Sequence, residues 1–255
     1  MPTDMWNIAS RRIRAGFTLV ELLVTIAVIG ILAGLLLPVL SRAKNNSRRA
    51  TCLNNLRQIN VATRMYFDEH EDAISLPSGV QFYADWVSYK PSVKYYLGLH
   101  GPSAPSEKIF MCPADTFSYL DSDLTGGPAW KGLRVNKGYC EQGWTGYNSY
   151  AFNGGNSLNS NLFPKLANPG IAGIRLTALK HPAKTLLVFE ASARLPFSWH
   201  RPEVDSRGYY QFGDSMNMLG FADGHVNFCR MYWNGALAAC MYDPPAGYDY
   251  QWSGN

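Results

Sequence analysis

The apolar residues of this chain are concentrated in one run near its N-terminus. From Phe17 to Leu37 the sequence is FTLVELLVTIAVIGILAGLLL, and its one charged residue is Glu21. A helix of this length rises about 31 Å, which matches the hydrocarbon thickness of a bilayer. The polar segment that follows lacks the small-residue cleavage site of a secretory signal peptide. The pattern therefore predicts a membrane-spanning helix over residues 17–40.

A second helical pattern follows this run, over residues 41–72. The apolar positions on one face are Cys52, Leu53, Leu56, Ile59, Ala62, Met65 and Tyr66. The polar positions on the opposite face are Asn54, Arg57, Asn60 and Arg64. This spacing predicts an amphipathic helix that continues the membrane helix as a stalk and lies under a globular head.

Residues 73–255 have a different pattern, in which short apolar runs alternate with Gly, Pro, Asn, Tyr and Trp. Such a pattern predicts a loop-rich globular head that contains a small antiparallel sheet. The clearest strand is Thr-Leu-Leu-Val-Phe at 185–189. The predicted fold class is therefore α+β, with a long N-terminal helix packed on a small antiparallel β-sheet.

The clearest hairpin surrounds Asp223-Gly224, a pair suited to a two-residue type I′ turn. That turn would pair Phe221 with Val226 and, two positions further out, Leu219 with Phe228. These four apolar side chains would then share one face of the hairpin and pack on the helix.

Charge adds little to this picture. The net charge is +4, and Arg11, Arg12 and Arg14 contribute much of it, so no nucleic-acid partner is expected. These arginines favour a cytoplasmic N-terminus. Basic residues after the span, from Arg42 to Arg49, compete with them, so charge alone leaves the orientation open.

Glu21 is the unusual residue of the span. A carboxylate inside a membrane costs a few kcal/mol unless it finds a partner. It either lies harmlessly at the headgroup level or meets a positive group on another subunit, which would favour assembly.

The segment Gly16-Phe17-Thr18-Leu19-Val20-Glu21, after basic residues and before an apolar run, resembles the processing site of type IV prepilins and type II secretion pseudopilins. The resemblance implies a pilin-like fold and cleavage by prepilin peptidase between Gly16 and Phe17. It also implies N-methylation of Phe17, and pairing of Glu21 with the N-terminal amine of a neighbouring subunit. Residues 1–16 would be the leader peptide.

Two further positions in the span fit this family. Gly30 and Pro38 fall where such helices are often loosened or kinked, and a proline removes one helical hydrogen bond. Glycine and proline are also common in membrane helices generally, so each position alone is ambiguous.

The head resembles large prepilin-like proteins of the Planctomycetes–Verrucomicrobia type. The similar segments are CLNNLRQ at 52–58, FMCPAD at 110–115, YNSYAFNG at 147–154 and FADGHV at 221–226. Those proteins often have a histidine ten positions before the Asp-Gly pair. Gly213 occupies that position here, and His200 is the candidate replacement.

The chain has five cysteines, which invite disulfides if the head lies in the periplasm. We expect Cys52 to pair with Cys112, because that bridge would join the head to the stalk. The alternative is that all five are free thiols. The sequence contains no Cys-x-x-Cys and no Cys/His spacing typical of a zinc site, so no metal site of that kind is expected.

Enzymatic activity is not expected. Gly213-Asp214-Ser215, with His200 or His225 as a base, resembles a hydrolase motif, but three-residue matches are common by chance. No cofactor is expected either. Asp121, Asp123 and Asp214 are weak candidates for calcium ligands, and a solvated loop is the alternative.

The preferred function is therefore a subunit of a type II secretion pseudopilus or a type IV pilus-like filament. Its partners would be prepilin peptidase, other pilin subunits and the inner membrane, with the head in the periplasm or on the cell surface. The alternative is a membrane-anchored adhesin or carbohydrate-binding protein. Exposed rings at Trp130, Trp144, Trp199 or Trp252 would favour that alternative, and buried rings the filament subunit.

Overall fold

A computed structural model describes residues 18–70, 88–120, 133–154, 169–194, 197–202, 213–234 and 242–254. The chain divides into two compact units, Met1–Lys44 and Asn45–Asn255. The second unit thus takes in the last part of the long N-terminal helix. Residues 45–69 of the amphipathic segment therefore belong to the head unit.

Helix α1 spans Leu19–Glu69 and continues without interruption through Gly30 and Pro38. The expected helix end, residue 72, lies outside the described residues, and His70 is already in a turn. In the first unit the large apolar side chains from Leu19 to Leu40 are all exposed. By length and composition, α1 is the one helix in the described part of the chain that is able to cross a membrane.

The second unit contains a four-stranded antiparallel sheet in the order β3-β4-β5-β6. Its strands are β3 (Tyr150–Phe152), β4 (Leu186–Glu190), β5 (Ser215–Phe221) and β6 (Val226–Met231). Strand β4 was predicted at 185–189 and is displaced by one residue. All five of its side chains are buried, and the first four of them form a continuous apolar run that ends at Glu190.

Short elements surround this sheet. Strands β1 (Ser118–Leu120) and β2 (Leu133–Val135) form a separate two-stranded sheet. The helical pieces are α3 (Lys90–Val93) and the 3₁₀ turns η1 (Lys94–Leu97), η2 (Lys108–Phe110), η4 (Tyr139–Glu141), η5 (Gly143–Thr145), η7 (Leu176–Ala178) and η8 (Ala191–Ala193). An α+β head with a small antiparallel sheet and a long N-terminal helix is thus confirmed.

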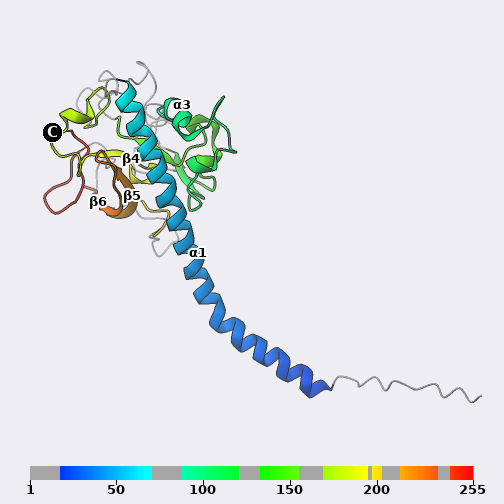
Figure 1. Ribbon diagram of the computed structural model, residues 1–255. Helices are drawn as coiled ribbons and strands as arrows, with labels where there is room; N and C mark the ends of the chain where they lie inside the picture. Colours follow the sequence, from blue (N-terminus) through cyan, green and yellow to red (C-terminus); the bar gives the residue numbers. More distant parts are fainter. Residues whose placement is uncertain are drawn as a thin grey trace, which may run out of the picture. The chain divides into compact units, whose positions relative to one another are not determined.

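The C-terminal half of α1 packs on one face of the sheet, beside β4 and β5 (Figure 1). On this face the Phe67 and Phe152 rings lie 6.0 Å apart, and Tyr150 Oη donates a 3.3 Å hydrogen bond to the Cys52 carbonyl. The opposite face is covered by the C-terminal segment, where Trp252 meets Phe189 edge to face at 4.9 Å. The core therefore has two layers, one on each side of the sheet.

The predicted register of the β5–β6 hairpin is wrong by one residue. Gly220 pairs with Val226 and Met218 with Phe228. The turn has three residues rather than two, since the Phe221 amide bonds the His225 carbonyl. Gly224 takes the positive φ, 103°, that a three-residue turn with a bulge requires.

This shift places the apolar residues on two faces. Phe221 lies opposite His225, and their rings stack at 4.1 Å. Val226 and Phe228 share the other face with Gly220, the face that α1 covers. One inserted turn residue reverses the faces because side chains alternate along a strand.

The predicted amphipathic pattern of α1 is wrong at Asn60 and Met65. Asn60 was placed on the solvent face, yet it is fully buried, whereas Met65, placed on the apolar face, is 44% exposed. Asn60 Nδ2 donates a 3.0 Å hydrogen bond to the Phe221 carbonyl at the end of β5. A polar side chain is tolerated there because it satisfies a backbone acceptor of the hairpin.

Candidate functional site

The processing site, Gly16 and Phe17, lies outside the described residues. The first described contacts are those of Thr18 and Glu21. The Thr18 amide and hydroxyl donate to Glu21 Oε2 at 2.9 and 2.7 Å, and the Glu21 amide donates to Thr18 Oγ1 at 3.2 Å. This reciprocal pattern is a capping box, which satisfies free amides at the start of a helix. Glu21 therefore caps α1 within its own chain, a role that the sequence analysis missed although Thr-x-x-Glu is its usual motif.

A disulfide joins Cys52 of α1 to Cys112, the pairing expected from the sequence. The two sulfurs are 2.15 Å apart, and 60 residues separate the cysteines along the chain. Both side chains are buried. The bond ties α1 to the segment after η2, within the second unit.

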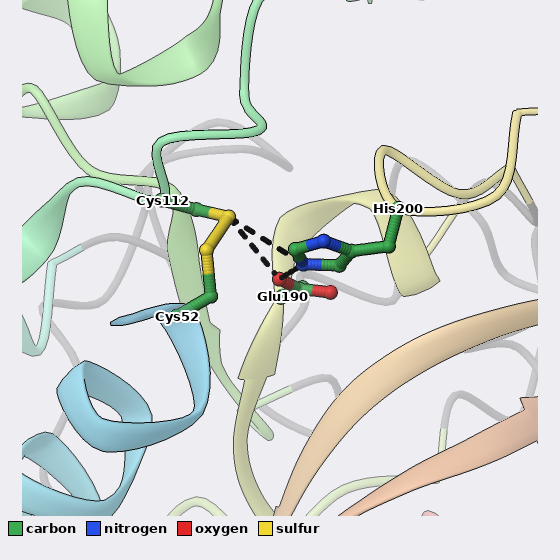
Figure 2. A group of neighbouring side chains, drawn as sticks. All are labelled: Cys52, Cys112, Glu190 and His200. Atoms are coloured by element: carbon green, nitrogen blue, oxygen red, sulfur yellow. Dashed lines mark hydrogen bonds and ion pairs between the residues drawn. A yellow bond between two sulfur atoms is a disulfide. The ribbon is translucent and has the colours of Figure 1, made fainter. Parts of the chain in front are cut away.

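Glu190 and His200 lie directly against this disulfide (Figure 2). Glu190 Oε1 is 2.8 Å from His200 Nε2 and 3.4 Å from Cys112 Sγ, and His200 Nε2 is 3.6 Å from the same sulfur. The Glu190 side chain is fully buried and that of His200 is 1% exposed. We call these four residues, Cys52, Cys112, Glu190 and His200, the sulfur–carboxylate cluster.

The backbone holds the carboxylate of this cluster in place. Glu190 ends β4, and its second oxygen, Oε2, accepts a 3.0 Å hydrogen bond from the Met218 amide of β5. His200 follows a turn in which Ser198 Oγ accepts hydrogen bonds from the His200 and Arg201 amides. A backbone amide therefore holds the Glu190 carboxylate, and the Ser198 hydroxyl holds the loop that carries His200.

Two hollows on the second unit reach the sulfur–carboxylate cluster. The larger, about 540 Å³, is lined by Cys112 together with Asn55 of α1 and Cys140. The smaller, about 230 Å³, is lined by His200 together with Arg48 and Trp199. Cys112 and His200 thus each border a hollow, although both side chains are buried.

The other described cysteines are thiols. Cys140 is buried, and burial together with the nearby Asp115 carboxylate raises its pKa to about 12. Burial likewise raises the pKa of Cys229 to about 11. Such thiols stay protonated near neutral pH and are poor nucleophiles. Cys240 lies outside the described residues.

The residues of the hydrolase-like motif do not assemble into a catalytic group. Ser215 Oγ accepts a hydrogen bond from Asn217, His200 pairs with Glu190, and His225 bonds Asp223. The serine and the two histidines therefore have separate partners. His200 also does not reach the Asp-Gly turn: its ring lies 6.0 Å from that of Phe228, further along β6.

The structure describes one of the three calcium candidates and three of the four candidate tryptophans. Asp121, Asp123 and Trp130 lie outside the described residues, and Asp214 forms a 2.9 Å ion pair with Arg230. Trp199 and Trp252 are buried, and Trp144 is 45% exposed. Of these three candidate rings, one is thus partly exposed.

The long apolar helix followed by an antiparallel head defines the class: this is a pilin-like architecture. The family model of the prokaryotic N-terminal methylation motif matches residues 11–37, so the chain has the N-terminal motif of type IV prepilin-like proteins. No match was found among the curated proteins or among the solved structures.

Sequence reasoning found the processing motif but missed the sulfur–carboxylate cluster. Glu190 was not singled out, and His200 was considered only as a base or as a replacement in the head motif. The members of the cluster come from α1, the loop after η2, β4 and a later loop, so no spacing along the chain links them. The one available signal was a charged residue ending a fully apolar strand.

Proposed function

We propose that this chain is the precursor of a filament subunit, either of a type II secretion pseudopilus or of a type IV pilus-like fibre. The observation that carries the proposal is the methylation motif at 11–37, which includes most of the exposed apolar part of α1 from Leu19 to Leu40. An apolar helix surface of this size is stable only in a membrane or against similar helices. The subunit acts by assembly rather than by catalysis.

In this proposal prepilin peptidase cleaves between Gly16 and Phe17, and Phe17 is then N-methylated. The new amine of one subunit pairs with the Glu21 carboxylate of its neighbour, because opposite charges in a low-dielectric site strongly favour each other. The helix spans the inner membrane once, with the head on the periplasmic or outer side. The buried rings of Trp199 and Trp252 support this function, whereas the ring of Trp144, 45% exposed, is the one a binding head would use.

The test is co-expression of the full chain with a prepilin peptidase, followed by intact mass and N-terminal analysis. We expect a product that begins at N-methylated Phe17. The matched control is Gly16→Ala, which should give an uncut, unmethylated chain that still inserts in the membrane. An uncut wild-type chain in the presence of a peptidase that cleaves a reference prepilin would overturn the proposal.

A further inference from the structure

A disulfide alone is enough to join α1 to the segment after η2. The sulfur–carboxylate cluster adds Glu190 and His200 to it, so four side chains of metal-binding type lie together. The ligand atoms of Cys52, Cys112, Glu190 and His200 all lie within 4.8 Å of one another. Two thiolates, an imidazole and a carboxylate are the ligands that zinc takes in proteins. We propose that the reduced form of this protein binds one zinc-like divalent cation here, so that disulfide and metal are alternative links at the same place.

The distances fit this proposal. In a tetrahedral zinc site, bonds of about 2.0 to 2.3 Å place neighbouring ligand atoms roughly 3.3 to 3.8 Å apart. Cys112 Sγ is already 3.4 Å from Glu190 Oε1 and 3.6 Å from His200 Nε2. The Glu190–His200 pair, at 2.8 Å, has to open slightly, and the two sulfurs have to separate once their bond is gone.

The surroundings also suit a metal. Glu190 is held through its other oxygen, Oε2, by the Met218 amide, so Oε1 can bind the cation once its 2.8 Å contact with His200 Nε2 opens. With two thiolates and one carboxylate, a divalent cation leaves one net negative charge, and Arg48 lines the adjoining hollow with a positive one. The larger hollow borders the cluster at Cys112.

The change between the two states is a balanced exchange. A dithiol reductant supplies two electrons and two protons, becomes a disulfide itself, and leaves Cys52 and Cys112 as thiols. Binding of the divalent cation then displaces the two thiol protons to solvent, since thiolates are the ligands. A small-molecule disulfide reverses the sequence: it accepts two electrons from the thiolates and two protons from solvent and becomes a dithiol, while the Cys52–Cys112 bond re-forms and the cation is released.

The experiment uses the full chain in detergent, in the variant Cys140→Ser/Cys229→Ser/Cys240→Ser, which keeps only the two clustered cysteines. The disulfide is reduced with a phosphine, which takes oxygen from water and becomes a phosphine oxide. Cobalt(II) is then titrated anaerobically as an optical probe for zinc. We expect one equivalent, with the visible d–d and sulfur-to-cobalt charge-transfer bands of a tetrahedral thiolate site, and displacement by zinc.

Three comparisons decide the outcome. The oxidised protein should bind no cobalt at this site. In the reduced protein, His200→Gln and Glu190→Gln should each weaken cobalt binding by about 10- to 100-fold. Circular dichroism follows folding throughout, and if reduction unfolds the head, one equivalent of metal should refold it.

The proposal is overturned if the reduced protein gives no tetrahedral cobalt spectrum. It is also overturned if the spectrum and affinity are unchanged in both His200→Gln and Glu190→Gln, since two thiolates and solvent would then hold the ion. Equal binding by oxidised and reduced protein would place the ion elsewhere and would likewise overturn it.

Discussion

Two roles are proposed for Glu21: it caps α1 within its own chain, and it pairs with the N-terminal amine of a neighbouring subunit. Its carboxylate accepts hydrogen bonds from Thr18 at the start of α1, which a neutral amide can also do. Pairing with a neighbour's amine, in contrast, needs the negative charge. The two roles therefore respond differently to Gln and to Ala.

We expect Glu21→Gln to be cleaved and methylated normally but to be lost from filaments, because the cap remains and the charge does not. Glu21→Ala should also be cleaved and should fail to assemble. Filament incorporation measured by shearing and immunoblotting checks both. If Gln is incorporated normally and Ala is not, Glu21 acts as a helix cap and the charge-pairing idea is wrong.

Asp115 is a buried carboxylate with a pH-dependent effect on the head. It is 4% exposed and accepts hydrogen bonds from the Tyr139 and Cys140 amides and from Ser149 Oγ. Burial raises its pKa to about 6, although these hydrogen bonds act in the opposite direction. The folded protein therefore binds this proton more tightly than the unfolded chain does.

Between pH 4 and pH 6 the folded state carries more protons at Asp115 than the unfolded state, so its contribution to stability falls as pH rises. We expect the free energy of unfolding of the wild type, relative to Asp115→Asn, to fall by at most about 3 kcal/mol from pH 4 to pH 7. Urea unfolding of both proteins across this range measures it. A constant difference between the two would show that Asp115 keeps an ordinary pKa.

The contact between α1 and the hairpin depends on a glycine in β5. A Cβ atom at Gly220 would lie 2.8 Å from the Val188 carbonyl oxygen and 3.1 Å from Asn60 Cγ. Both neighbours are fixed, the first as strand backbone and the second by its hydrogen bond to Phe221. Helix and sheet can approach this closely only because residue 220 has no side chain.

Gly220→Ala should therefore destabilise the head by about 1–3 kcal/mol, through overpacking of α1 against the sheet. Gly213→Ala is the matched control, since a Cβ there meets nothing within 4 Å and should change stability by less than about 0.5 kcal/mol. Unfolding in urea, followed by tryptophan fluorescence, compares the two. Equal effects of the two substitutions on stability would mean that α1 moves away from the new methyl group at residue 220 at little cost in free energy.

At the scale of the whole molecule, the head is incomplete without the last part of α1. The compact second unit begins at Asn45, and Leu56, Ile59 and Phe67 of the helix are fully buried in it. Burying each such side chain stabilises a protein by about 1.5–3 kcal/mol, and total stabilities are about 5–15 kcal/mol. The disulfide partner Cys52 also belongs to this segment.

We therefore expect a truncated chain of residues 45–255 to fold and one of residues 73–255 not to fold. Near-ultraviolet circular dichroism and cooperative thermal unfolding distinguish the two. A cooperative transition in the shorter chain would show that the sheet and its C-terminal layer form a sufficient core by themselves.

The sequence alone determined the features that depend on neighbouring residues. The membrane-length helix, its processing motif, the amphipathic segment after it and strand β4 were all visible, because hydrophobic periodicity and residue order are local properties. The Thr18–Glu21 cap was equally local and could have been found. These features were sufficient for the pilin-like class.

Only the tertiary structure decided what depends on residues far apart in the chain. The length of the hairpin turn, and with it the face on which Phe221 and Val226 lie, followed from how β5 meets α1 and β4. The burial of Asn60 followed from a backbone acceptor 161 residues away. The sulfur–carboxylate cluster likewise exists only after folding, because long-range packing brings its four side chains together and no spacing in the sequence records that contact.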